Sequence, residues 1–224
     1  MKHPLRLLDG TMLKLIAMIS MVFDHAGDLF FPDQVWMRII GRIAMPLFAF
    51  TVTEGYLHTH SKKKYLLRML LFALISEVPF DLALFGKGLE LTHQNIMFTF
   101  AYAILGLMCY EKITKGDKIS VSGMIVLFLF IITSLLLHLD YNMVALAVIF
   151  SYYLFKNKSL SIRNLITMVV YFLFRNKGVY VCALLGFLLV FLYNGKRGKG
   201  FKWLFYVFYP GHLLFLFLMK DLFS

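Results

Sequence analysis

Long apolar segments recur along the whole sequence and constrain its fold more than any other feature. A helix that crosses a bilayer needs about 20 apolar residues at a rise of about 1.5 Å each. Such segments lie near residues 11–31, 35–57, 65–85, 93–110, 121–139, 140–155, 164–175, 178–194 and 201–220. The chain is 60% hydrophobic with a mean hydropathy of +0.76, whereas soluble domains are about 45–50% apolar. We therefore predict an all-α fold, a polytopic transmembrane bundle of about nine helices.

The seventh apolar segment is the weakest. Residues Asn164 to Phe174 alone would cover only about 16 Å. Either this helix starts earlier, or residues 164–194 form a hairpin that enters the membrane and returns. Neither a linker rich in Pro, Gly and Ser nor a large polar block interrupts the sequence, so residues 1–224 are predicted to form a single membrane domain.

The distribution of positive charge predicts the orientation. The net charge of +11 would indicate nucleic-acid binding in a soluble protein, but in this chain Lys and Arg gather at alternate ends of the apolar segments. One set of ends carries 17 of them: Lys2, Arg6, Lys14, Lys62, Lys63, Lys64, Arg68, Lys112, Lys115, Lys118, Lys156, Lys158, Arg163, Lys196, Arg197, Lys199 and Lys202. The opposite ends carry five: Arg38, Lys87, Arg175, Lys177 and Lys220. The N-terminus is therefore predicted to be cytoplasmic, with the bilayer and no nucleic acid as partner.

Several ionisable residues interrupt the apolar segments, at a cost of roughly 2.5–3.5 kcal/mol each on insertion scales. Asp24 and His25 lie inside the first segment, Arg42 inside the second and Glu77 inside the third. Counting residues from the segment ends places all three segments' polar groups in the outer half of the membrane. We expect them to form one functional layer, with Asp24 orienting His25 or else pairing with Arg42.

Two pairs of charged residues in this layer have helical spacing. Arg38 and Arg42 are four residues apart, as are Glu77 and Asp81, so each pair shares one helix face. An intramembrane network between the two arginines and the two carboxylates is predicted. Such pairs can serve only to hold helices together, or the arginines can also bind a carboxylate, phosphate or thioester oxygen.

Further polar groups lie at the predicted outer ends and in the last segment. His93, Gln94 and Asn95 open the fourth segment, where they either cap the helix or contribute to a site. In "HLDYN" at 138–142, capping is the favoured interpretation. His212 is placed about 15 Å into the last segment, after a helix break expected at Pro210-Gly211, and this favours a functional role. Glu54 is predicted to reach the cytoplasmic interface.

Two classes of function fit these features. In a membrane acyltransferase, a histidine deprotonates an amine or hydroxyl that attacks a thioester, and cationic or amide donors stabilise the oxyanion. Direct transfer is favoured because no Ser or Cys lies in a recognisable nucleophile motif, and no metal site is predicted. In a proton- or ion-coupled small-solute transporter, the Asp24, His25, Arg42 and Glu77 layer would act as a relay. No convincing internal repeat supports a transporter.

Four sequence blocks resemble the TraX family. They are "DGTMLKLIAMISMVFDHAG", "RIIGRIAMPLFAFTVTEGYLHTHSKKKYLLRMLLFALISEVPFDL", "HQNIMFTF" and "YPGHLLFLFLMK". They occur in the expected order through nearly the whole chain, whereas residues 111–200 resemble the family mainly in hydropathy. The namesake acetylates the N-terminus of conjugative pilin in the bacterial inner membrane. The family looks distantly similar to acyltransferase-3 enzymes and the lysosomal glucosaminide acetyltransferase.

The resemblance implies a multi-pass enzyme of the bacterial cytoplasmic membrane that uses cytoplasmic acetyl-CoA or another acyl-CoA. His25 matches the early-helix histidine of these enzymes, with Asp24 as its neighbour and His212 as a further catalytic candidate. Arg38, Arg42, Glu77, Asp81, His93 and Asn95 lie in the matching blocks and are candidates for substrate binding. The CoA phosphates are expected at Lys62, Lys63 and Lys64 or at the 195–200 loop. An exported peptide N-terminus or an envelope glycan hydroxyl is the expected acceptor.

Overall fold

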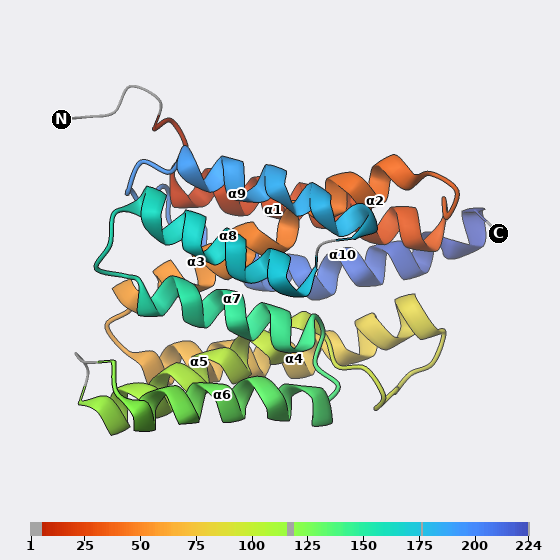
Figure 1. Ribbon diagram of the computed structural model, residues 1–224. Helices are drawn as coiled ribbons and strands as arrows, with labels where there is room; N and C mark the ends of the chain where they lie inside the picture. Colours follow the sequence, from red (N-terminus) through yellow and green to blue (C-terminus); the bar gives the residue numbers. More distant parts are fainter. Residues whose placement is uncertain (1–5, 116–118, 176, 224) are drawn as a thin grey trace.

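The chain folds into a bundle of helices that run back and forth between two ends (Figure 1). The computed structural model describes residues 6–115, 119–175 and 177–223, so Lys2 and Lys118 of the predicted basic set lie outside the described residues. Within the described ranges the elements are α1 (Gly10–Leu29), α2 (Val35–Gly41), α3 (Ala44–His58), α4 (Lys62–Phe85), α5 (Ile96–Thr114), α6 (Val121–Leu136), α7 (Asn142–Leu154), α8 (Leu160–Phe174), the 3-10 helix η1 (Gly178–Ala183), α9 (Leu184–Phe191) and α10 (Lys202–Phe223). The prediction of an all-α fold is confirmed.

Short polar residues set many of the helix starts. Asp9 caps α1 by accepting a hydrogen bond from the Met12 backbone at 2.8 Å. Ser61, Ser120 and Ser159 cap α4, α6 and α8 in the same way. These side chains satisfy backbone N–H groups that a helix start leaves without an internal partner. The starts of α1, α4, α6 and α8 are therefore set by caps that the sequence provides.

The loops at each end of the bundle are tied together. At the end that carries most of the positive charge, hereafter the basic end, the Leu8 N–H donates to Leu192 at 3.0 Å and the Gly10 N–H to Lys196 at 2.9 Å. At the other end, hereafter the cavity end, the Gln94 N–H donates to His138 at 2.9 Å. Alternate loops thus gather at opposite ends, the arrangement that the charge pattern requires.

Two details of the predicted helices differ from the structure, and one open alternative is decided. The weak seventh segment starts earlier, as one of the two predictions had it, and α8 has 15 residues from Leu160. The second segment is divided into α2 and α3 by a turn at Arg42 and Ile43. The break expected at Pro210-Gly211 is wrong, since α10 continues through Pro210. A proline removes one N–H, and tertiary packing can hold the helix together around it.

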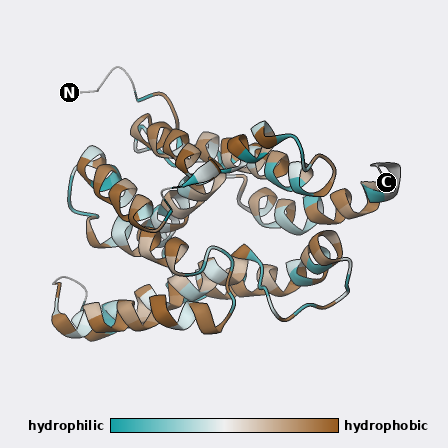
Figure 2. Cartoon of the chain, turned by 45° about the vertical axis from the view of Figure 1, so that its right-hand side comes forward, coloured by the Kyte–Doolittle hydropathy of each residue, from teal (hydrophilic) through white to brown (hydrophobic). Residues whose placement is uncertain are grey.

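The bundle has a buried centre and an apolar outside. Residues Val144 to Tyr153 of α7 are all buried, because α3, α5, α6 and α8 pack around that helix. Large apolar side chains on α4, α6, α8 and α10 face outward, including Leu74, Leu136 and Leu173. Figure 2 shows hydrophobic residues over most of the helices and hydrophilic ones concentrated in the loops. Among the described residues, Val35–His58, Ile96–Thr114 and Trp203–Lys220 are long and apolar enough to cross a membrane.

Candidate functional site

A cavity of about 330 Å³ lies near the cavity end and collects polar groups from helices far apart in sequence. Its walls come from α1, α2, α3, α4, α5 and α10, the 138–142 turn and the residues around η1. The ionisable and hydroxyl-bearing residues that line it are Asp24, His25, Asp28, Arg38, Arg42, His93, Asp140, Tyr141, Arg175, Tyr180 and Tyr209. Asp24, His25 and Arg42 of the predicted polar layer thus meet part of the outer-end turns in one space, whereas Glu77 of that layer does not line it.

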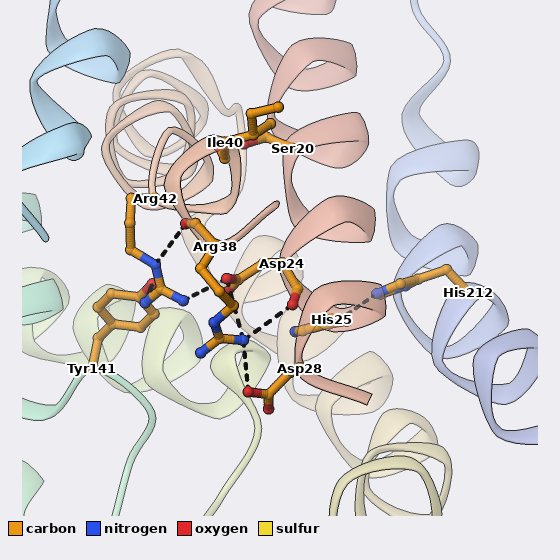
Figure 3. Close-up of polar contacts among 9 residues, drawn as sticks. All are labelled: Ser20, Asp24, His25, Asp28, Arg38, Ile40, Arg42, Tyr141 and His212. Carbon is orange, nitrogen blue, oxygen red and sulfur yellow. Dashed lines mark hydrogen bonds and ion pairs between the residues drawn. The ribbon is translucent and has the colours of Figure 1, made fainter. Parts of the chain in front are cut away.

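His25 is paired with His212, a contact that spans α1 and α10 (Figure 3). The His25 Nδ1 and His212 Nε2 atoms are 2.9 Å apart, and the two rings are nearly parallel. His212 is buried and stacks on Phe208, with ring centroids 4.7 Å apart. His25 lines the cavity, whereas His212 lies behind it. The two histidines were predicted separately, and the structure places them side by side.

The hydrogen bonds of this pair assign protons to specific nitrogens. His212 Nδ1 is 3.0 Å from the Phe208 carbonyl oxygen, which only accepts, so this nitrogen carries the proton of the neutral ring. His212 Nε2 then has a lone pair and accepts from the Nδ1–H of His25. The remaining nitrogen of His25, Nε2, is left with a lone pair. His25 is therefore held as a base, and His212 is a positioning residue that fixes its tautomer.

Asp24 serves the arginines and not the histidine. Its Oδ1 pairs with Arg42 Nη2 at 2.5 Å and with Arg38 Nη1 at 3.4 Å. Arg38 also pairs with Asp28 at 2.9 Å and donates to the Asp24 carbonyl at 3.0 Å. The prediction that Asp24 orients His25 is wrong, because adjacent residues on a helix point about 100° apart. Its alternative, a pair with Arg42, is what the structure has.

Arg42 is the most constrained of these cations. Its side chain is 6% exposed, and its Nη1 donates to the Tyr141 hydroxyl at 3.2 Å. The Tyr180 ring lies 5.3 Å from the guanidinium carbon, a cation–π distance. The break between α2 and α3 occurs at this residue, where the Arg42 Nε donates to the Arg38 carbonyl at 3.3 Å. Arg42 is therefore a fixed positive group in the cavity wall.

The predicted network between the two arginines and Glu77 with Asp81 is wrong. Glu77 hydrogen-bonds the side chain of Asn95, and Asp81 accepts from the Glu90 N–H at 2.7 Å. Asn95 also caps α5 by accepting from Met97 at 3.0 Å. Glu77 and Asn95 hold the start of α5, Asp81 holds the loop before it, and none of the three lines the cavity. Helix spacing identified the faces correctly, but it does not specify which helices are neighbours.

The predicted phosphate-binding lysines lie at the other end of the molecule. Lys62 pairs with Glu111 and lies 4.8 Å from the centre of the Tyr56 ring. Lys63 and Lys64 are exposed in the first turn of α4. None of the three is near the cavity that holds His25, as expected for groups assigned to the cytoplasmic side.

The 138–142 turn was predicted to cap a helix, but it contributes Asp140, Tyr141 and Asn142 to the cavity wall. Its capping interpretation fails for α7, where Tyr141 stands at the N-cap with no side-chain hydrogen bond to the helix. His138, Tyr141 and Asn142 have positive φ values of 49°, 55° and 42°. Such backbone in non-glycine residues is uncommon and costs energy, and it clusters at functional sites. The polar residues of the 138–142 turn are evident in the sequence, but nothing in the sequence indicates that Tyr141 reaches Arg42.

Comparison with known proteins decides the family. The family model described as TraX protein matches residues 9–220 of the chain. The chain belongs to the TraX family. The probable fimbrial assembly protein FimC, serogroup H1, of Dichelobacter nodosus is 30% identical to it over 232 residues, which cover 91% of this chain and 92% of FimC. Protein TraX of Escherichia coli strain K12 is 34% identical over 92 residues, which cover 41% of this chain and 36% of TraX. No solved structure matches the chain.

Membership in the TraX family agrees with the apolar helices. The family match covers all of the helices from α1 to α9 and most of α10. Together, these two findings indicate a bacterial membrane protein. In this TraX-family chain the cavity residues Asp24, His25 and Arg42, and His212 behind them, all fall inside the matched region.

Gly41 allows α1 and α2 of the TraX-family fold to approach closely. A Cβ atom at this position would overlap the Asp24 side chain. We expect Gly41→Ala to lower the free energy of unfolding by about 1–3 kcal/mol, as overpacking does, and to lower the thermal midpoint in detergent. Gly211→Ala on α10 is the matched control, because its new Cβ would have no described atom within 4 Å apart from its chain neighbours and its own helix backbone. Equal midpoints for the two variants would show that the close approach is not required.

His93 precedes α5 and gives the cavity end a pH-dependent contact. Asp140, with its Oδ1 3.6 Å from His93 Nε2, raises the pKa of His93, as do Glu77 and Asp81 more weakly. A raised folded-state pKa stabilises the fold below the ordinary pKa of about 6.5 and stops doing so as the pH rises through the folded value. The difference in thermal midpoint between wild type and His93→Gln should therefore be larger at pH 5.5 than at pH 8.5. The exposed Asn157→Gln, which changes no ionisable group, should show the same difference at both pH values.

Proposed function

We propose that this protein is an integral membrane acyltransferase. It moves an acyl group, in the first place acetyl, from cytoplasmic acyl-CoA to an amine or hydroxyl at the outer side of the bacterial cytoplasmic membrane. The observation that carries the proposal is the His25–His212 pair, which holds a lone-pair nitrogen at the wall of a cavity beside two arginines. Membership in the TraX family supports the same chemistry.

In the proposed step, His25 Nε2 takes the proton of the acceptor as its nitrogen or oxygen attacks the thioester carbonyl. The new C–N or C–O bond forms and the C–S bond breaks. The CoA thiolate leaves and recovers the proton from His25. Arg38 and Arg42 are placed to donate hydrogen bonds to the carbonyl oxygen while it carries negative charge, which is worth most in a site of low dielectric. Tyr141 and Asp24 hold Arg42 in position for this role.

The charge distribution supports a proposed orientation of the protein in the membrane. The basic end is proposed to face the cytoplasm, where acyl-CoA is available, and the cavity end to face outward. His25 is fifteen residues from the start of α1 at Gly10, about 22 Å along the helix. The proposed base therefore lies close to the outward side, as an exported acceptor requires.

An exported pilin or fimbrial subunit is the first candidate for the acceptor. One relative is named a probable fimbrial assembly protein and another is protein TraX, and the family resemblance links TraX to the pilin N-terminus. A free peptide N-terminus is an amine that His25 can deprotonate. An envelope glycan hydroxyl has equivalent chemistry and is the second candidate.

Ligand binding distinguishes the proposed acyltransferase from the alternative, a proton- or ion-coupled transporter. The thermal midpoint of the purified protein is measured with CoA or a non-hydrolysable acetyl-CoA analogue, and separately with Na⁺, K⁺ and other small ions. The acyltransferase predicts a rise with the CoA ligands, because a ligand that binds only the folded state stabilises it. A rise with an ion and none with either CoA ligand would favour the transporter and contradict the proposal.

A further inference from the structure

A second cavity, of about 170 Å³, lies at the basic end and shares no residue with the first. Its charged lining residues are three cations and one carboxylate, Arg6, Lys158, Arg163 and Glu54. They come from the segment before α1, the loop before α8, the first turn of α8 and the last turns of α3. Positive charge thus exceeds negative charge in this space, which makes it a candidate for binding an anion.

Arg163 is the buried and most firmly held charged residue of this cavity. The residue is 6% exposed, its Nε donates to the Tyr152 carbonyl at 2.6 Å, and its Nη1 pairs with Glu54 Oε1 at 2.7 Å. Its guanidinium also lies over the Phe50 and Tyr152 rings, at 5.6 and 5.5 Å. Yet its buried Nη2 has no hydrogen-bond partner within the described part of the chain. A buried charged donor without a partner is costly, so a ligand that satisfies it would bind with an advantage.

This arrangement also corrects two predictions about the basic end. Glu54 was expected to reach the interface, but it is tied to Arg163 and lies 3.5 Å from His58. Arg163 was counted among loop charges, but it is buried at the start of α8. The two corrections have one cause: the helix starts at Leu160, which turns Arg163 inward.

The remaining groups favour a phosphate as the anion. Leu160, the first residue of α8, lines the cavity, so the N-terminal end of a 15-residue helix adds partial positive charge there. Lys158 and Arg6 are exposed and can follow a ligand that enters from the basic end. A guanidinium matches the oxygen spacing of a phosphate, and lysine adds a mobile charge.

We propose that the Arg6, Lys158 and Arg163 cavity binds a phosphate group of the CoA nucleotide, which anchors the donor at the cytoplasmic end. This assignment rests on the proposed acyltransferase function. It moves the phosphates away from Lys62, Lys63 and Lys64, to a cavity that the alternative 195–200 loop lines through Gly195. It places the anchored end of the donor about 20 Å from His25 along the helices. The headgroup phosphate of an anionic lipid has the same chemistry, so the experiment must separate the two sources.

The test measures the Kd of the purified full-length protein for CoA, 3′-dephospho-CoA and pantetheine by isothermal titration calorimetry. Arg6→Gln together with Lys158→Gln should weaken CoA binding at least tenfold and leave pantetheine, which has no phosphate, unchanged. Lys112→Gln, which removes an exposed lysine at the same end from α5, should bind CoA like wild type. Arg163 itself is left intact, because its loss would strand Glu54 and weaken the fold.

Wild-type CoA affinity in the double variant would overturn the assignment. If that variant had also lost the phosphatidylglycerol that wild type binds in native mass spectrometry, the site would be a lipid site. A wild-type protein that binds no CoA would overturn the proposed function and this assignment together, so the two failures are distinguishable.

Discussion

His25→Gln is expected to lower the rate of acyl transfer by about 10²–10⁴-fold, the usual contribution of a positioned general base. Glutamine keeps a hydrogen-bonding side chain in the wall of the cavity but has no basic nitrogen. The measurement is transfer of labelled acetyl groups from acetyl-CoA by purified protein. His60→Gln, which changes an exposed histidine at the basic end, should retain wild-type activity. Full activity of His25→Gln would remove this residue from the mechanism.

His212→Gln separates a positioning role from a merely structural one. If His212 fixes the tautomer of His25 through the 2.9 Å contact, its loss should lower kcat more than it raises KM. It should also move the pH dependence of kcat, since that profile reports the base in the bound enzyme. A variant with lowered thermal stability but an unchanged pH profile would contradict the positioning role.

Breaking the Asp24–Arg42 pair is expected to have the largest effect on stability. The two side chains are 15% and 6% exposed, and removal of one partner from a buried ion pair typically costs about 3–5 kcal/mol because the other charge is left unpaired. Arg42→Leu and Asp24→Leu should each lower the thermal midpoint markedly. The double variant should lose less than the sum, because neither charge is then stranded.

Lys87→Gln provides the control for that experiment. Lys87 pairs with Glu90 at 2.8 Å, but the lysine side chain is 65% exposed. Surface ion pairs contribute about 0–1 kcal/mol, so the midpoint of this variant should stay near that of wild type. Additive losses in the Asp24 and Arg42 double variant would show that the two charges do not depend on each other.

The sequence was sufficient to predict the helices but not their neighbours. Apolar length is a local property, so most helix ends were predicted to within a few residues, although α8 starts at Leu160, after its cap Ser159, and not at the predicted 164. Charge alternation predicted which loops gather at each end. The pairing of Arg42 with Asp24, and not with Glu77, depends on the close approach that Gly41 permits between α1 and α2. That contact is tertiary and has no periodic signal.

The charged residues of the candidate site could be predicted from the sequence, but its tyrosines and the contacts between its residues could not. Charged residues in apolar segments are conspicuous, so Asp24, His25, Arg42 and His212 can all be identified from the sequence. Tyr141 and Tyr180 were not, because a tyrosine in a hydrophobic chain carries no signal of its own. The contact between His25 and His212 joins residues 187 positions apart. Only the packing of α10 across the bundle reveals it.

Transfer across the membrane is the most direct test of the central proposal. Inside-out membrane vesicles that contain the protein are loaded with acceptor peptides bearing free N-termini, and labelled acetyl-CoA is added outside, on the cytoplasmic face. We predict that label appears on the enclosed peptides with wild type and falls at least a hundredfold with His25→Gln. Label confined to peptides added outside, or equal labelling of the enclosed peptides by His25→Gln, would contradict the account.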